Sequence, residues 1–158
     1  MSNCLLCGNQ VRVPLRFANL FSTTTESWLC TSCRAGFLSA ESKQDGNVRA
    51  IFKWNEQAEN FVERYLNMQD DELSKCFCIE VGKKVRPKLA YLPLSEAGRQ
   101  ILVAAAIPCV MLSEQNQQAE MGVFLMRSAE KVQLAKLSGV HGKIVHVLVL
   151  FEEELSCE

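Results

Sequence analysis

The sequence predicts an α/β protein in which a small N-terminal zinc ribbon precedes an open parallel sheet with flanking helices. Two observations lead to this fold class. Two Cys-x-x-Cys pairs lie near the N-terminus, and they consist of Cys4, Cys7, Cys30 and Cys33. Further along, apolar segments of strand length alternate with helical patterns, and the last strand segment, 143–151, is apolar on both faces. A strand buried on both faces is typical of a central parallel sheet.

The cysteine pairs predict a structural zinc site. Tetrahedral Zn²⁺ takes four ligands, with sulfur at about 2.3 Å, and a two-residue gap lets both sulfurs of one knuckle point inward. Gly8 follows the first pair directly and supplies the backbone freedom that a knuckle turn needs. Four thiolates leave no open coordination position, so we expect a structural and not a catalytic role.

Two other interpretations of the cysteines stay open at this point: a pair of disulfides and a thioredoxin-like redox pair. No charged segment followed by a long apolar segment opens the chain, so we expect no signal peptide and a reducing, cytoplasmic location. A redox pair would follow a buried strand, and Ser2 and Asn3 do not form one.

The composition is that of a globular protein, with 48% hydrophobic and 22% charged residues. No apolar run approaches the roughly 18 residues that a membrane span requires, so no span is expected. The formal net charge of −1 does not favour nucleic acid, so any such binding must come from a local patch.

We expect three parts along the 158 residues: a head at 1–38, a polar, Gly-containing linker at 39–47 and an α/β domain at 48–158. In the head, 11–17 alternates apolar and polar residues and suits an edge strand. A short helix is expected at 34–38, and Trp28 either packs over the metal site or fills the core.

The domain begins with a predicted strand at 48–54, followed by Asn55 as a helix N-cap. The apolar positions of that helix recur with helical spacing and are Ala58, Phe61, Val62, Tyr65 and Leu66. Asp70 can cap the next helix, with Leu73, Cys76 and Phe77 facing inward. Four cysteines outside the pairs remain, Cys76, Cys78, Cys109 and Cys157, and we interpret the first two as buried thiols.

The only dense basic cluster consists of Lys83, Lys84, Arg86 and Lys88. It is interpreted either as a solvated loop or as a phosphate-binding patch. After it, the pattern predicts a strand at 89–94, a helix at 96–106 capped by Ser95, and a short strand at 107–112. A weak helix is expected at 120–137, and His146 on the last strand is either a satisfied core histidine or a catalyst.

The order of these pieces resembles the ComF family of late competence proteins. The Cys-Leu-Leu-Cys-Gly start with its second cysteine pair resembles the family's metal-binding head. The segment Ala-Ile-Phe-Lys-Trp-Asn-Glu at 50–56, running through a helix to Asp70, is similar to the family's next block. Tyr-Leu-Pro-Leu-Ser at 91–95 resembles its Pro-x-Pro-Leu-Ser strand end, and Arg127 and 142–151 fall where the family has an arginine and the strand before its phosphoribosyl pyrophosphate loop.

The resemblance implies a type I phosphoribosyltransferase-like domain behind a zinc-binding head. It also implies a role in natural competence, in the uptake of single-stranded DNA for transformation, with a helicase partner.

The chain departs from the family at the phosphate loop. The last strand is followed by an acidic pair, Glu152 and Glu153, which the resemblance assigns to ribose hydroxyls and metal. The small residues and the Thr-Gly that would wrap the phosphate are missing, and the chain stops before a following helix. We therefore expect an incomplete domain with no catalytic residues and no Mg²⁺ or phosphoribosyl pyrophosphate cofactor.

Three functions are carried forward. The first is a ComF-like protein of DNA uptake that binds single-stranded DNA or a helicase without phosphoribosyl transfer. The second is a working phosphoribosyltransferase that uses Glu152 and Glu153. The third is a zinc-ribbon module that contacts DNA or protein through the basic cluster and through Arg12, Arg16 and Arg34 around the knuckles.

Overall fold

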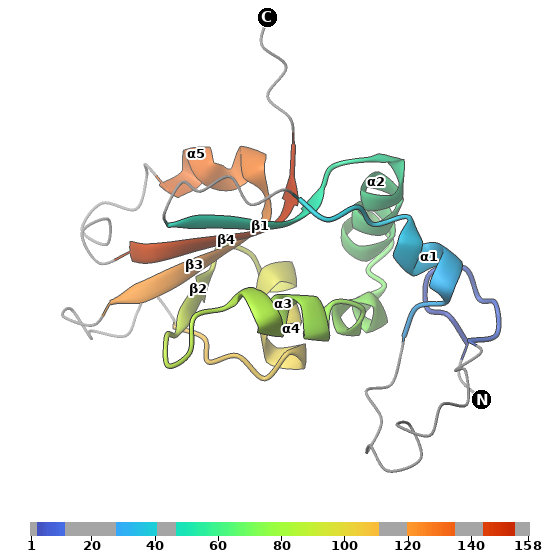
Figure 1. Cartoon of the computed structure of the whole chain (residues 1–158), viewed down its shortest axis with the longest axis horizontal. Coiled ribbons are helices and arrows are strands. Elements are labelled where there is room, and N and C mark those ends of the chain that lie inside the picture. The colour runs from blue at the N-terminus through green and yellow to red at the C-terminus, as the bar shows by residue number, and fades with distance from the viewer. Residues whose placement is uncertain (1–2, 12–27, 41–46, 111–119, 135–143, 154–158) are drawn as a thin grey trace, which may run out of the picture.

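The computed structural model describes residues 3–11, 28–40, 47–110, 120–134 and 144–153. These residues form an α/β structure built on a four-stranded, all-parallel sheet (Figure 1), which confirms the predicted class. The sheet order is β1-β4-β3-β2. The strands are β1 (Val48–Lys53), β2 (Tyr91–Pro93), β3 (Met121–Arg127) and β4 (Ile144–Glu152).

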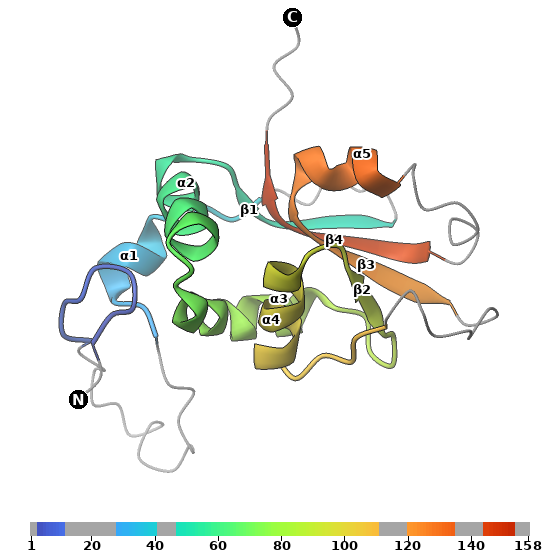
Figure 2. The same ribbon diagram turned by 180° about the vertical axis from the view of Figure 1, so that it is seen from behind.

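Helices cover both faces of the sheet. The helices α2 (Glu56–Val62), α3 (Cys78–Lys84) and α4 (Glu96–Ala104) lie on one side, and α5 (Lys131–Leu134) lies on the other (Figure 2). The short helix α1 (Thr31–Ala35) stands at one end of the molecule beside α2. Among the described residues, no helix is long and apolar enough to cross a membrane.

The central position of β4 is confirmed. It pairs with β1 on one side and with β3 on the other, and its residues from His146 to Phe151 are buried. Alternate side chains of β4 therefore enter two separate cores, with Leu148 facing α2, α3 and α4 and Val149 facing α5. This is the two-sided burial that the apolar run indicates.

The helix predicted at 120–137 is wrong over most of its described length. Residues Met121–Arg127 form β3, followed by a 3₁₀ turn at Ser128–Glu130 and the single turn α5. The first six residues of β3 are buried on both faces, so no polar position marks a period of two. Periodicity alone does not separate such a run from a buried helix. Residues 135–137 lie outside the described part.

Both predicted N-caps that precede long helices are confirmed. The Asn55 side chain accepts a hydrogen bond from the Ala58 N–H at 2.9 Å, and Ser95 Oγ accepts one from the Gly98 N–H at 3.1 Å. After Val62 the chain continues as a π-helical turn, Glu63–Asn67. The wider turn shifts the register, so Tyr65 stays buried while Leu66 is 41% exposed, and the prediction for Leu66 is wrong.

The next two helical segments differ from the prediction. Asp70 makes no capping hydrogen bond and pairs instead with Arg64 at 2.6 Å, before a 3₁₀ segment at Asp71–Lys75. Lys83 and Lys84 form the last turn of α3 and not a loop. Leu73, Cys76 and Phe77 are buried as predicted, and Cys78 is half-buried.

The strand predicted at 107–112 is reduced to a single bridge in its described part. The Tyr91 N–H donates to the Pro108 carbonyl at 2.9 Å, and the Val110 N–H donates to the Tyr91 carbonyl at 2.9 Å. Pro108 has no N–H of its own, so it cannot extend the ladder. Residues 111–112 lie outside the described part.

The segment after α1 is joined to the sheet. The Ala40 N–H donates to Ile51 O at 3.0 Å and the Lys53 N–H to Leu38 O at 2.8 Å, so 38–40 run antiparallel to β1. Phe37 is buried among four other phenylalanine rings from β1, α2, the start of α3 and β4: Phe52, Phe61, Phe77 and Phe151. One aromatic core is therefore shared by the cysteine-bearing segment and the sheet. The domain boundaries themselves stay predictions.

Candidate metal centre and the two ends of the sheet

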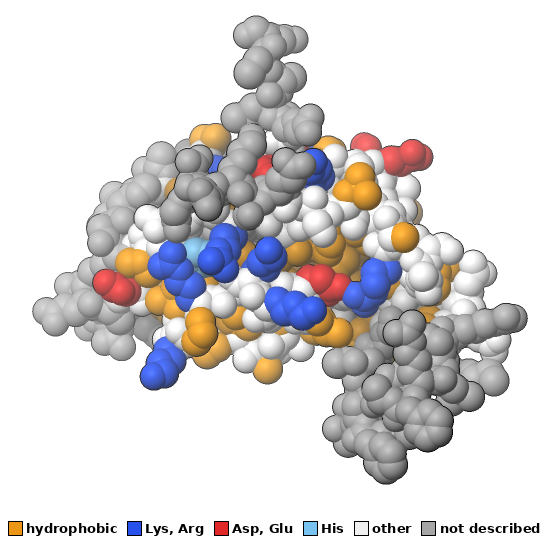
Figure 3. Space-filling view, viewed as in Figure 1, with side chains coloured by type: hydrophobic (Ala, Val, Ile, Leu, Met, Phe, Trp, Pro, Cys, Tyr) orange, Lys and Arg blue, Asp and Glu red, His pale blue; other side chains and the backbone are white. Residues whose placement is uncertain are grey.

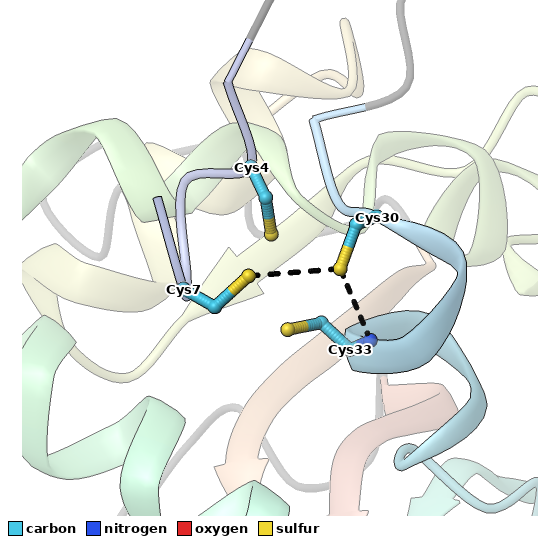
Figure 4. A group of neighbouring side chains, drawn as sticks. All are labelled: Cys4, Cys7, Cys30 and Cys33. Carbon is cyan, nitrogen blue, oxygen red and sulfur yellow. Dashed lines mark hydrogen bonds between the residues drawn. The ribbon is translucent and has the colours of Figure 1, made fainter. Parts of the chain in front are cut away.

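The structure brings the four predicted cysteines together. Cys4 and Cys7 come from the loop at 3–11, and Cys30 and Cys33 from the start of α1 (Figure 4). Their sulfur atoms all lie within 4.8 Å of one another, and Cys7 Sγ is 3.6 Å from Cys30 Sγ. Four ligands at about 2.3 Å around a tetrahedral ion stand about 3.8 Å apart. The cluster could therefore hold one metal ion, as in a structural zinc site.

None of the described cysteines is in a disulfide. The disulfide interpretation therefore does not apply to Cys4, Cys7, Cys30 or Cys33. The redox interpretation also loses support, because both pairs face one shared point and not two separate ones.

The first knuckle closes through backbone hydrogen bonds. The Cys4 N–H donates to the Asn9 carbonyl at 2.7 Å, and the Gly8 N–H donates to the Cys4 carbonyl at 2.8 Å. Gly8 has φ of 75°, in the left-handed region that favours glycine. The sequence-based role of Gly8 is thus confirmed.

The second knuckle is the beginning of α1. Cys30 is the N-cap, and its sulfur accepts a hydrogen bond from the Cys33 N–H at 3.4 Å. The Leu5 N–H donates to the Trp28 carbonyl at 2.9 Å, which ties the two knuckles together. Trp28 is half-buried and packs against the main core, which supports its interpretation as a core residue.

The electrostatics of the cluster favour partial ionisation. Burial raises the pKa of Cys4, but N–H groups of Cys30, Cys7 and Leu6 outweigh it and lower this pKa to about 6. Burial and hydrogen bonds with the neighbouring thiols raise the pKa of Cys33. Thiols this close cannot all ionise alone, and a divalent cation supplies the charge that lets each become a thiolate ligand.

Polar contacts attach this centre to the helices. The Arg34 guanidinium forms an ion pair with Glu80 of α3, and the Arg64 guanidinium donates to the Leu6 carbonyl. The Asn55 amide donates to the Gly36 carbonyl at 2.8 Å, in addition to capping α2. Arg34 was a candidate DNA contact, and here its charge is paired with a carboxylate. Arg12 and Arg16 lie outside the described residues.

At the carboxyl end of the sheet, one of the two predicted ligand-binding glutamates is held by the protein itself. Glu153 accepts from Arg127 Nε at 2.7 Å, and its N–H donates to Ser128 Oγ at 2.9 Å. The Arg127 guanidinium lies 4.3 Å from the centroid of the Trp54 ring. Glu152 is the register partner of Lys53 on β1. Residues 154–158 lie outside the described part.

The basic cluster lies at the other end of the strands. Lys83 and Lys88 are exposed, and Lys84 and Arg86 are half-buried. The Arg86 N–H donates to Tyr91 Oη at 2.9 Å, and its guanidinium donates to the Val145 carbonyl at 3.3 Å. Lys and Arg side chains gather over the face that carries α3 (Figure 3).

A feature that the sequence did not reveal lies beside this cluster. Tyr91, Gly122 and His146 are in register across β2, β3 and β4. Because Gly122 has no side chain, the Tyr91 ring lies over it, and Tyr91 Oη reaches His146 Nδ1 at 2.7 Å. A glycine inside a strand often marks such a close approach.

Gly122→Ala is expected to destabilise the protein by about 1–3 kcal/mol or more, the usual range for overpacking. A Cβ at this position would lie 2.4 Å from the nearest Tyr91 ring atom, so the ring must move and its bond to His146 breaks. Urea unfolding measures the loss. Gly82→Ala in α3 is the control, because its Cβ meets nothing within 4 Å and alanine favours a helix. Equal stability of the two variants would contradict the close approach.

His146 is expected to make stability depend on pH. Burial first, then the charges of Arg86 and Arg49, lower its pKa to about 4. In the unfolded chain this pKa is about 6.5. Between these values the unfolded state binds a proton that the folded state does not. The free energy of unfolding therefore falls by about 3 kcal/mol as the pH falls from about 6.5 to about 4. His146→Gln does not titrate and should lose less stability over that window in urea unfolding; parallel pH profiles would refute the assignment.

Comparison of the chain with protein-family models, with curated proteins and with solved structures finds no match. A proposal for its function therefore has to rest on the residues described above. These are the four-thiol centre, the carboxyl end with its internal ion pair, and the basic amino end.

Proposed function

We propose that this chain is a ComF-like, cytoplasmic protein of natural competence that binds single-stranded DNA during uptake and does not transfer phosphoribosyl groups. One observation carries the proposal: a four-thiol centre packs onto a parallel α/β sheet whose central strand ends in an acidic pair. This combination is what the resemblance implies, and it joins segments that are far apart in the sequence.

Zinc is the metal we propose for the four-thiol centre. Soft thiolate ligands favour Zn²⁺ among the common divalent ions, and a closed set of four sulfurs has no position for a substrate. The centre lies beside α2 and shares the Phe37 core with the sheet. Its proposed role is therefore to hold the head against the α/β body.

The carboxyl end supports a protein without transferase activity. A carboxylate that holds a ribose hydroxyl or a metal must offer its oxygens to the ligand. Glu153 already accepts from Arg127, which is itself packed on Trp54. Phosphoryl and phosphoribosyl chemistry relies on preorganised contacts to the charges of the substrate, and here Glu153 and Arg127 are paired with each other.

The basic amino end supports DNA as the partner. The four basic residues lie within one helix turn and the segment that follows it, and two of them, Lys83 and Lys88, are exposed. Binding through phosphates needs no net positive charge on the whole chain, only a local patch. A helicase would be a further partner in the same process.

The test is binding of a fluorescent oligothymidylate, measured by anisotropy between about 50 and 200 mM salt. We expect affinity to fall steeply with salt, with a slope of about −0.7 per phosphate contact on single strands. The triple variant K83Q/K84Q/K88Q should reduce that slope, and Lys131→Gln, an exposed lysine on α5, should not. Absence of binding, or binding that is insensitive to salt, would remove the proposal.

A second assay addresses transfer. The purified protein is incubated with Mg²⁺ and phosphoribosyl pyrophosphate, and release of pyrophosphate is followed. We expect no release above the buffer control. Turnover would show that the non-catalytic part of the proposal is wrong and would favour a working phosphoribosyltransferase.

A further inference from the structure

The side chain of His146 has one nitrogen without a partner. His146 is 0% exposed, and its Nε2 is buried with no hydrogen bond, a condition that only Glu80 Oε2 shares among the buried side chains of the described residues. A buried nitrogen without a hydrogen bond destabilises the fold, because it has lost its contact with water and gained no partner. Such an atom needs an explanation, and a bound ligand is one.

The partners of Tyr91 indicate which nitrogen of His146 carries the proton. Tyr91 Oη accepts from the Arg86 N–H at 2.9 Å and lies 2.7 Å from His146 Nδ1. Among the described residues Tyr91 Oη has no partner besides the Arg86 N–H and His146 Nδ1, so Nδ1 is the acceptor for the hydroxyl proton. We therefore assign the proton of the neutral imidazole to Nε2. The orphan atom is therefore a hydrogen-bond donor.

The surroundings of this donor are positively charged. Tyr91 reaches His146 from the β3 side of β4, and Arg49 lies on β1, the opposite neighbour, in register with Leu148 and so on the same face as His146. Arg86 approaches from the end of α3 and contacts the backbone next to His146, at Val145. The positive charges of both arginines contribute to the lowered pKa of His146, after burial, and no carboxylate of the described residues is among the causes of this shift.

Arg49 supplies the free charge at this point. It is exposed and forms no ion pair with any of the described residues, unlike Arg34, Arg64, Arg99 and Arg127. A buried N–H donor with arginines on two neighbouring elements is suited to an anion whose oxygens accept several charge-assisted hydrogen bonds.

We propose that a phosphate group binds at this amino end of the sheet, held by Arg49, Arg86 and the Nε2–H of His146. The site is separate from the acidic carboxyl end and from the metal centre. It goes beyond the proposed function, because it does not require DNA as the ligand. Inorganic phosphate, a phosphomonoester and the phosphodiester of a DNA backbone all offer phosphate oxygens that accept hydrogen bonds. Two of its residues, Arg49 and His146, lie outside the basic cluster.

The first experiment uses inorganic phosphate as the probe, at pH 7 and at ionic strength matched with sodium chloride. We expect phosphate to raise the melting temperature of the full chain above the chloride control and to shift the His146 imidazole Nε2–H signal in NMR spectra. Arg49→Gln should weaken phosphate binding about tenfold, the loss expected for one charge-assisted hydrogen bond. Lys131→Gln, on the other side of the sheet, should leave it unchanged.

Three results would overturn the inference: an equal effect of chloride, equal phosphate binding by the Arg49→Gln variant, or an imidazole signal that phosphate does not move, which would indicate a buried water only. Arg49 is exposed, so its substitution should not prevent folding. His146→Phe provides a second variant, which has no hydrogen-bond donor at this position and should lose the phosphate effect while keeping its metal.

An oligothymidylate arm separates the source of the phosphate and the two proposals. If Arg49→Gln weakens both inorganic phosphate and the oligonucleotide, the site anchors a DNA backbone. If it weakens inorganic phosphate alone, the ligand is a free phosphate or a monoester. If the chain binds phosphate but no DNA, the proposed function is wrong and this site stands. If the chain binds DNA equally well with and without Arg49 and does not bind phosphate, the proposed function stands and this site is wrong.

Discussion

Replacing Cys4 by serine is expected to remove the metal and unfold the head. Cys4 is one of four sulfurs within 4.8 Å of one another, and it is 2% exposed, in the same core as Leu29 and Phe37. Serine is a poor ligand for a soft site, so the variant keeps three thiols and loses the closed tetrahedral set. Structural zinc contributes about 10–16 kcal/mol of apparent binding free energy at pH 7, which makes this the largest single effect we expect.

Metal content per chain, measured on purified protein by mass spectrometry, gives the result directly. The unmodified protein should carry one ion per chain and the Cys4→Ser variant less than a tenth of that. Cys109→Ser is the matched control, because Cys109 is a half-buried thiol whose hydrogen bond to the Ile107 carbonyl a serine can retain. A metal-free natural protein, or full occupancy in the variant, would contradict the metal centre.

Phe37→Ala should cost about 3–5 kcal/mol of the free energy of unfolding, the usual range for deleting a buried phenylalanine. The Phe37 ring lies 4.8 Å from that of Phe77 and 5.6 Å from that of Phe52, centroid to centroid, and meets Phe77 edge to face. Its removal leaves a cavity at the point where the cysteine-bearing segment meets the sheet. Such aromatic pairs also contribute about 0.5–1.5 kcal/mol beyond the buried area.

Urea unfolding followed by circular dichroism measures this loss. Leu38→Ala, next in the chain and 54% exposed, should change stability by no more than about 0.5 kcal/mol. If the two substitutions cost the same, Phe37 does not join the head to the body. A loss of metal affinity in Phe37→Ala would further show that the two parts are coupled.

Features that depend on a few neighbouring residues could be predicted from the sequence. A two-residue gap lets both sulfurs of a Cys-x-x-Cys pair point inward, and Gly8 permits the turn at φ of 75°. Asn55 and Ser95 cap their helices because a side-chain oxygen needs only the N–H three residues later. The long two-sided apolar run of β4 indicates a central strand for a similar reason: burial on both faces removes the need for polar positions.

Features that depend on contacts between distant segments could not be predicted from the sequence. The run in β3 is apolar on every side, so its own pattern fits a helix as well as a strand, and only its pairing with β2 and β4 selects the strand. Leu66 has helical spacing, but a π turn rotates it toward solvent.

At the two ends of the sheet, too, some features follow from neighbouring residues and others only from the pairing of distant strands. The sequence shows directly that Glu152 and Glu153 follow the last strand. The ion pair between Glu153 and Arg127 instead depends on the pairing of β3 with β4. The contact of Tyr91 with His146 across Gly122 likewise requires three parallel strands in one register, which no short stretch encodes. Local order thus specified the knuckles, the caps and the buried central strand, and the assembled sheet specified which charged and polar side chains meet, because neighbours across a parallel sheet are remote along the chain.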